Sequence, residues 1–150
     1  MANEHGENQD RIVVGVDGSE PSRAALRWAL RQARLTGAAV DAVIGWEVPT
    51  SFGWDMAVVG ADDIKAAAAK TLEATIEQEA GQRPEVPVDA RVMEGNAARV
   101  LLDAAEGADL IVVGNRGHGG FTGALLGSVS QHCVHHAKCP VVVIRGEHRS

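Results

Sequence analysis

The stretch Arg11–Ser19, RIVVGVDGS, joins a short apolar run to the start of a helix. A run of about four to eight residues dominated by Val and Ile is typical of a strand buried on both faces of a parallel sheet. Ser19 is a favourable helix N-cap, and Pro21 suits the first helical turn. The stretch therefore predicts a central strand, Arg11–Val16, that leads at once into a helix.

The same alternation of strand and helix continues along the chain, which favours a parallel sheet with crossover helices. Further runs rich in Val and Ile predict strands over Val40–Trp46, Val86–Met93, Leu110–Val113 and Val141–Ile144. The patterns between the strands predict helices over Ser19 to about Leu35, Ala61 to about Ala80, Gly95 to Glu106 and Ser128 to about Ala137.

The polarity of each predicted strand also indicates its place in the sheet. Arg11–Val16 and Leu110–Val113 are almost purely apolar and belong in the middle. Val86–Met93 alternates in polarity and contains Pro87, which suits an edge. We therefore predict a single α/β, doubly wound (flavodoxin/Rossmann-like) domain with a five-stranded parallel sheet in the order 3-2-1-4-5 and helices on both faces. This domain is expected over residues 11–146, between a flexible N-terminal segment, 1–10, and a C-terminal tail, 147–150.

The last predicted strand, Val141–Ile144, is fully apolar and yet lies at an edge in this order. An exposed apolar edge promotes aggregation unless something covers it. We therefore expect a homodimer that forms through this strand.

Composition and charge narrow the class of protein. The chain has 150 residues, of which 45% are apolar and 23% charged, as is ordinary for one globular domain. Its formal charge of -6, without a cluster of Lys and Arg, argues against nucleic-acid binding. No apolar stretch is long enough for a membrane span, and Met1–Asp10 is polar and acidic where a secretion signal would be basic and then apolar. We expect a cytoplasmic protein whose Cys133 and Cys139 are reduced.

In an open α/β sheet, ligands bind beyond the carboxyl ends of the strands, where the strand order reverses. Here that place lies after the first and fourth strands, and the loop that follows the fourth contains six glycines between Gly114 and Gly127. Glycines let the backbone approach a ligand closely, and the free N–H groups at Ser128, Val129 and Ser130 of the next helix can hold a phosphate chain. A glycine-rich loop can equally be a series of turns.

Asp17 follows the first strand and borders the same crevice. A carboxylate at this position can accept hydrogen bonds from ribose hydroxyls or help to hold a metal bound to phosphates. The alternative is that Asp17 only shapes the turn before Ser19.

The spacing Gly114-x2-Gly117-x9-Gly127-Ser128 resembles the G-x2-G-x9-G-[ST] signature of the ATP-binding branch of the universal stress proteins. Other stretches are similar to further blocks of that family, so that the resemblance covers the chain from about Arg11 to Arg145. These stretches are Val13–Ser19, Gly119–Phe121, Leu126–Ser130 and Cys139–Val143. The resemblance implies a stress-response regulatory protein that binds ATP between the loops after strands 1 and 4.

The resemblance also implies a position for each residue along the nucleotide. Asp17 would meet the ribose and adenine end, and the backbone near Gly45 would face the adenine edge. Gly127, Ser128 and Val129 would hold the outer phosphates, with Mg²⁺ or Mn²⁺ as a candidate companion but without dedicated metal ligands. The implied binding residues are Gly15, Val16, Asp17, Gly45, Gly114, Asn115, Arg116, Gly117, His118, Gly119, Gly120, Gly127, Ser128, Val129 and Ser130.

Other functions stay open beside ATP binding. Hydrolysis needs a base near the terminal phosphate, and the expected place of Asp17 is at the other end of the nucleotide. The P-loop pattern G-x4-G-K-[ST] is also absent. We therefore expect no catalytic residues, and the alternatives are a weak ATPase or phosphotransferase, a module that responds to cyclic AMP, and a partner-binding module without a ligand.

A group of His132, Cys133, His135 and His136 lies on the last predicted helix. His132 and His136 are four residues apart and share a face, so two metal ligands are geometrically possible. The structural interpretation is stronger, because the HExxH glutamate and further ligands are missing and Cys133 falls at core spacing.

Overall fold

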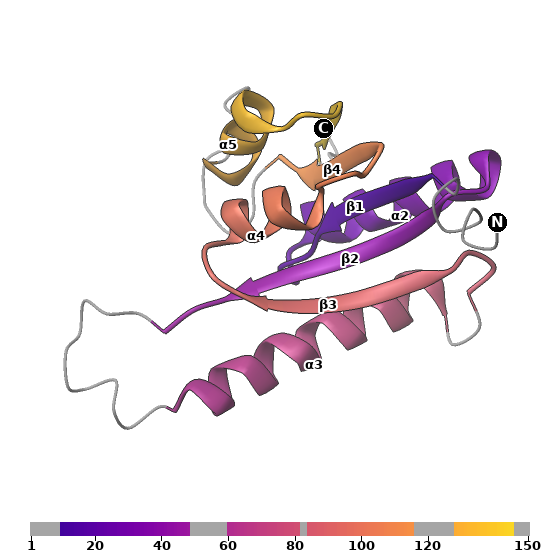
Figure 1. Cartoon of the computed structure of the whole chain (residues 1–150). Coiled ribbons are helices and arrows are strands. Elements are labelled where there is room, and N and C mark those ends of the chain that lie inside the picture. The colour runs from indigo at the N-terminus through magenta and orange to yellow at the C-terminus, as the bar shows by residue number, and fades with distance from the viewer. Residues whose placement is uncertain (1–9, 49–59, 82–83, 116–127, 146–150) are drawn as a thin grey trace, which may run out of the picture.

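The computed structural model describes residues 10–48, 60–81, 84–115 and 128–145 of the chain. Five strands form one parallel sheet in the order β3-β2-β1-β4-β5 (Figure 1), which confirms the predicted fold class and strand order. The strands are β1 (Arg11–Gly15), β2 (Ala39–Trp46), β3 (Val88–Glu94), β4 (Leu110–Gly114) and β5 (Val141–Ile144). The predicted N-terminal segment, apart from Asp10, and the C-terminal tail lie outside the described residues.

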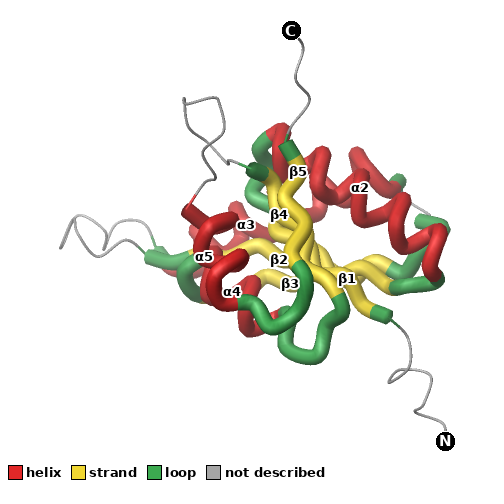
Figure 2. The backbone as a smooth tube through the Cα atoms, turned by 90° about the horizontal axis from the view of Figure 1, so that it is seen from above, coloured by secondary structure: helices red, strands yellow, loops and turns green. Residues whose placement is uncertain are grey.

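Helices cover both faces of the sheet, as predicted (Figures 1 and 2). They are α2 (Glu20–Thr36), α3 (Ala61–Ala80), α4 (Ala97–Ala104) and α5 (Ser128–His136). One core lies between the sheet and the pair α2 and α3, and a second lies between the opposite face and the pair α4 and α5. No helix in the described ranges is both long enough and apolar enough to cross a membrane.

Helix α2 begins and ends at the residues that the sequence indicates. The Oγ of Ser19 accepts a hydrogen bond from the Ser22 N–H at 3.3 Å, so Ser19 caps the helix. Gly37 ends it in the left-handed conformation, with φ of 82°. The small residues Ala25, Ala29 and Ala33 are buried against the sheet, which lets α2 pack closely on β1 and β4.

Three predicted boundaries are wrong by two residues, one of them the end of α4, which lies at Ala104 instead of Glu106. Strand β3 begins at Val88 instead of Val86, because Pro87 has no N–H to donate to the ladder and only its carbonyl bonds to β2. Helix α4 begins at Ala97 instead of Gly95, because the Asn96 side chain caps it by accepting from the N–H groups of the next turn.

The amino ends of the central strands are joined by Arg11. Its guanidinium donates to the Asp41 carboxylate on β2 at 3.0 Å and to the carbonyl oxygens of Ala104 and Glu106, at 3.0 and 2.8 Å. Asp41 is buried, so the ion pair compensates for the loss of water around its charge. This network fixes the end of α4 against the sheet and leaves the carboxyl edge free for a site.

The carboxyl ends of three strands carry glycines that have almost no space for a side chain. A Cβ on Gly114 would lie 2.6 Å from the carbonyl carbon of Pro21, one on Gly15 would lie 2.8 Å from Leu101, and one on Gly45 would lie 2.9 Å from Val100. These glycines therefore allow α2 and α4 to pack close to the ends of β4, β1 and β2.

We predict that Gly114→Ala lowers the free energy of unfolding by roughly 1–3 kcal/mol, because its methyl group would overlap the backbone of Pro21. Denaturant unfolding of the purified variant measures this change. Gly60→Ser is the matched control, since Gly60 caps α3 and a Cβ there meets no atom of the described residues closer than 4.0 Å. Equal stability of Gly114→Ala and the wild type would contradict the close packing at the end of β4.

Candidate functional site

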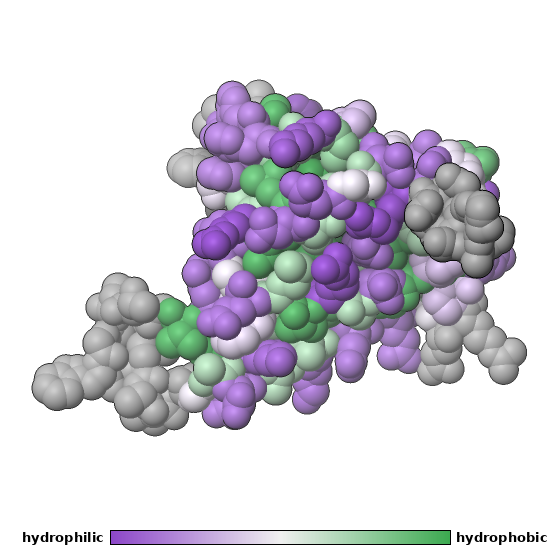
Figure 3. Space-filling model, in the orientation of Figure 1, coloured by the Kyte–Doolittle hydropathy of each residue, from purple (hydrophilic) through white to green (hydrophobic). Residues whose placement is uncertain are grey.

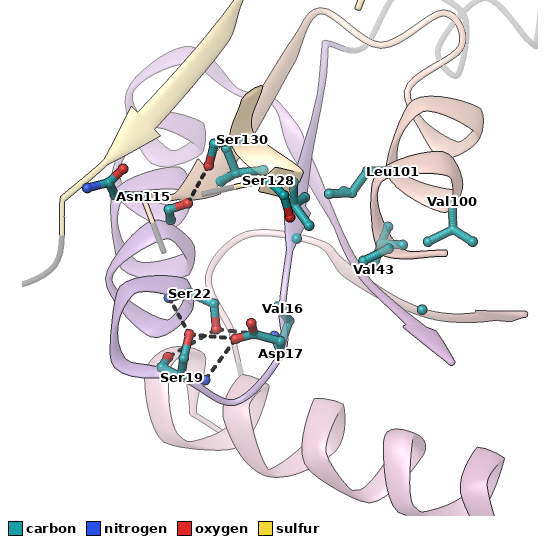
Figure 4. A pocket seen from close by; sticks show the side chains of 16 residues that line it. Val16, Asp17, Ser19, Ser22, Val43, Val100, Leu101, Asn115, Ser128 and Ser130 are labelled. Carbon is teal, nitrogen blue, oxygen red and sulfur yellow. Dashed lines mark hydrogen bonds between the residues drawn. The ribbon is translucent and has the colours of Figure 1, made fainter. Parts of the chain in front are cut away.

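A cavity of about 460 Å³ lies at the carboxyl ends of β1 and β4, where the strand order reverses. Its walls come from the turn after β1, the ends of β2 and β4, the first turns of α4 and the start of α5 (Figure 4). The volume is within the usual range for a small-molecule site, about 300–1,000 Å³.

One wall of the cavity is a polar turn between β1 and α2. The Oδ1 of Asp17 accepts hydrogen bonds from the N–H of Ser19, at 2.9 Å, and from its hydroxyl. The Asp17 N–H donates to the Oγ of Ser22 at 3.2 Å. Asp17 therefore does shape the turn before Ser19, but through one carboxylate oxygen only. Because the residue is exposed and lines the cavity, its second oxygen is accessible to a ligand.

The opposite wall is apolar and comes mainly from α4. Val100 and Leu101 are buried and face the cavity together with Val43 of β2, as Figure 4 shows. Gly15 and Gly45 let these two α4 side chains lie close to the strand ends, at the contacts given above. A flat apolar group fits against this wall better than a charged one does.

The start of α5 forms the third side, and its two serines differ. The Ser130 side chain is buried, and its hydroxyl donates to the carbonyl oxygen of Gly114 at 2.7 Å. The Ser128 side chain is exposed and lines the cavity. The first N–H groups of a helix have no partners within it, and the helix dipole adds partial positive charge there. This end of the cavity is therefore suited to an anion, with the Ser128 hydroxyl beside it.

Asn115 extends the site beyond the end of β4. Its N–H donates to the carbonyl oxygen of Ile144 at 2.7 Å, which holds it against β5. Its Oδ1 is buried without a hydrogen-bond partner among the described residues. A buried acceptor without a donor typically costs about 1–3 kcal/mol, so this oxygen is a candidate acceptor for a ligand N–H or O–H.

The structure brings together all the predicted binding residues that it describes. These residues are Gly15, Val16, Asp17, Gly45, Gly114, Asn115, Ser128, Val129 and Ser130, and each lines the same cavity. The other predicted residues, Arg116, Gly117, His118, Gly119, Gly120 and Gly127, lie outside the described residues.

Sequence reasoning missed the apolar wall and part of the polar turn. The residues missed are Ser19, Ser22, Val43, Ala97, Val100, Leu101 and Val113. The signal for the serines was their position in the first turn of α2, directly after Asp17. The signal for the α4 residues was weaker, because the pattern of a short helix does not show which part of it extends past the sheet.

The two cysteines and the histidines of α5 lie apart from this cavity. Cys133 is buried in the second core, where burial raises the pKa of its thiol to about 11, so the thiol stays protonated at neutral pH. Cys133 and Cys139 are both free thiols. Within the described ranges, no group of three or more His, Cys, Asp or Glu side chains is placed to hold a metal ion.

The fold and the position of the cavity define an open α/β domain with a ligand site at its topological switch point. The model of the universal stress protein family matches residues 9–145. The chain therefore belongs to the universal stress protein family.

Individual relatives agree with this assignment. A universal stress protein of Mycobacterium tuberculosis is 37% identical over 137 residues, which cover 89% of this chain and 45% of the relative. The chain thus spans about half the length of the curated relatives it matches.

Solved structures share the fold. A universal stress protein from Lactobacillus plantarum superposes with a TM-score of 0.78 at 24% identity, covering 91% of this chain and 97% of that one. A universal stress protein solved in complex with cAMP superposes with a TM-score of 0.68 at 24% identity, covering 92% and 98%.

We predict that Ser130→Ala lowers the free energy of unfolding by about 1–3 kcal/mol, because it leaves the Gly114 carbonyl without the hydroxyl that bonds to it. Ser128→Ala changes the same kind of side chain two residues away, but at an exposed position, and should leave stability unchanged. Denaturant unfolding of both variants makes the comparison, and equal effects of the two substitutions would count against the Ser130 bond.

Proposed function

We propose that this chain binds an adenine nucleotide, with ATP as the principal ligand, and that the bound nucleotide regulates its interactions under stress. The observation that carries the proposal is that three surfaces of different chemistry line one cavity. An apolar wall lies at α4, an accessible carboxylate lies at Asp17, and a helix start lies at Ser128. These three surfaces match a base, a sugar and a phosphate chain in chemistry.

The adenine ring would lie against Val43, Val100 and Leu101, with the backbone near Gly45 at its edge. The second carboxylate oxygen of Asp17 would accept hydrogen bonds from ribose hydroxyls. The phosphates would then lie near the N–H groups of Ser128 to Ser130, where the helix dipole favours negative charge. Figure 4 shows the apolar residues, Asp17 and the start of α5 as three separate sides of the cavity, one for each part of the nucleotide.

Two further observations support an adenine nucleotide. A protein of the same fold has been solved with cAMP, which is an adenine nucleotide. The spacing Gly114-x2-Gly117-x9-Gly127-Ser128 resembles the signature of the ATP-binding branch of the family, which favours ATP over cAMP.

Regulation is proposed in place of catalysis because of where the acidic group lies. Asp17 is the one carboxylate among the described lining residues, and it belongs to the turn after β1, apart from the start of α5. Activation of water at a terminal phosphate needs a positioned group at that phosphate. A Mg²⁺ or Mn²⁺ ion would be held mainly by the phosphates and water, as Mg²⁺ commonly is.

We further propose that two copies pair along β5. The carbonyl oxygens of Pro140 and Ile144 accept from the N–H groups of Ile111 and Asn115 on the β4 side. Because backbone groups alternate along a strand, the N–H and C=O of Val141 and Val143 are directed away from β4 to the free edge. Edge pairing with a second copy would satisfy these groups and cover apolar side chains that are only partly buried in one chain.

Calorimetric titration tests the nucleotide site, and two substitutions test its two ends. Ser128→Ala should weaken ATP binding about tenfold, through loss of a hydrogen bond to a charged phosphate, without weakening adenosine binding. Asp17→Asn keeps an oxygen for the Ser19 N–H but replaces the free one, so it should weaken ATP and adenosine alike. Asp103→Asn, an exposed change outside the cavity, is the control.

The outcomes of this titration separate the possible functions. Absence of heat with ATP, ADP and cAMP would overturn the nucleotide proposal. Tighter binding of cAMP than of ATP would identify cAMP as the principal ligand. Sustained release of ADP in the same samples would show that the protein is a slow ATPase.

The dimer is tested by measuring mass in solution with light scattering. Val143→Pro removes one outward N–H and should give monomers with the β4 ladder intact. Val143→Thr retains the N–H while changing the side chain, so it should stay dimeric. A monomeric wild type at micromolar concentration would contradict pairing through β5.

A further inference from the structure

Helix α5 carries a pair of histidines that the nucleotide site does not use. The imidazole rings of His132 and His136 lie side by side, with their centroids 4.5 Å apart and their planes tilted by 36°. Both residues are exposed, and over α5 the face shown in Figure 3 is largely hydrophilic. Among the described residues, neither ring has a hydrogen-bond or ion-pair partner that would compete with a ligand.

We propose that His132 and His136 chelate a divalent transition-metal ion of the Zn²⁺, Ni²⁺ and Cu²⁺ class on the surface of α5. Neutral imidazole is the commonest protein ligand for these ions. Residues four apart on a helix project from one face, so the two rings can reach a single ion without a change in the backbone.

The separation of the rings suits such an ion. With metal–nitrogen bonds of about 2.0–2.1 Å, two imidazoles on one ion have centroids roughly 4.5–5.2 Å apart for bond angles of about 90–110°. The observed 4.5 Å falls within that range. Binding would therefore require ring rotation and little movement of the helix.

The surroundings of the pair add negative potential. His136 also borders a second cavity, of about 320 Å³, that Asp103 and Glu106 line from the end of α4. The histidines lie in the last half of α5, close to the negative end of its dipole. Lys138 is the opposing cation, but it is 4.0 Å from the Glu106 carboxylate and its side chain is 88% exposed, so it can turn away.

With two protein ligands, the proposed metal site is an open one. Since the described residues contain no group of three or more metal-binding side chains, water completes the coordination. Such a site binds reversibly and leaves open positions, unlike a closed structural zinc site. It also discriminates against Mg²⁺, which prefers oxygen ligands and would accompany the phosphates instead.

A chelate across residues 132 and 136 would hold one turn of α5 in helical form. An ion that binds the folded chain and not the unfolded one raises its thermal stability in proportion to the logarithm of ion concentration above Kd. The inference is independent of the proposed nucleotide site, because it is measured in the absence of nucleotide.

The test is calorimetric titration of the tag-free, full-length chain with NiCl₂ in a non-chelating buffer, with thermal unfolding of the same samples. His132→Ala and His136→Ala should each weaken the tightest Ni²⁺ site by at least about tenfold, since even loss of a group that only orients a ligand commonly costs that much. His135→Ala, an exposed histidine on the same helix outside the ring pair, is the matched control and should bind as the wild type does.

Each result bears directly on the chelate. Ni²⁺ should raise the Tm of the wild type and of His135→Ala but not that of His132→Ala. Excess Mg²⁺ should not displace the bound Ni²⁺. Equal Tm values in EDTA would show that the variants fold. Unchanged Ni²⁺ affinity in His132→Ala and His136→Ala, or an equal loss in His135→Ala, would overturn the proposal.

Discussion

The close approach of helices to the carboxyl ends of β1, β2 and β4 is the constraint on which the site depends. At Gly114 the backbone of Pro21 occupies the place that a side chain would need, because a Cβ on Gly114 would lie 2.6 Å from the carbonyl carbon of Pro21. At Gly15 and Gly45 the same is true of Leu101 and Val100. These contacts bring the first turns of α2 and α4 to either side of the cavity and keep the strand ends free of side chains. The glycines are therefore required by packing before any ligand is considered.

This conclusion changes how the glycine signature is understood. A glycine in a ligand-binding motif is usually interpreted as a place where the ligand meets the backbone. Gly114 also meets Pro21, so loss of binding in a Gly114 variant would not identify a ligand contact. Substitutions of Ser128 and Asp17 are more informative, because both side chains are exposed. Near Ser128, the bond that stabilises the fold is made by Ser130, and in Asp17 it is made by Oδ1, which leaves the other oxygen for a ligand.

The sequence allowed the sheet to be predicted because strand polarity depends on burial, and burial depends on position in the sheet. Pro87 and the mixed polarity around it placed β3 at an edge, and the apolar β1 and β4 belonged in the centre. Boundaries failed where one local bond decided them, as at Asn96, whose side chain caps α4. The apolar wall at Val100 and Leu101 could not be predicted, because the rotation of α4 about its axis is set by packing on Gly15 and Gly45. The partner of the Ser130 hydroxyl could not be predicted either, because Gly114 lies 16 residues away in the sequence and only the fold brings the two together.

Helix α5 connects these observations because little of it is fixed by its own sequence. It has nine residues, and helices of that length are marginal in isolation, so tertiary contacts must hold it in place. Only Ser130 and Cys133 are buried in it, the first bonded to the end of β4 and the second packed in the core. Its first residues, Ser128 to Ser130, line the cavity, and its histidine pair lies one to two turns further on. A phosphate at one end and a metal ion at the other would each stabilise the same short helix, so the two ligands should favour each other's binding.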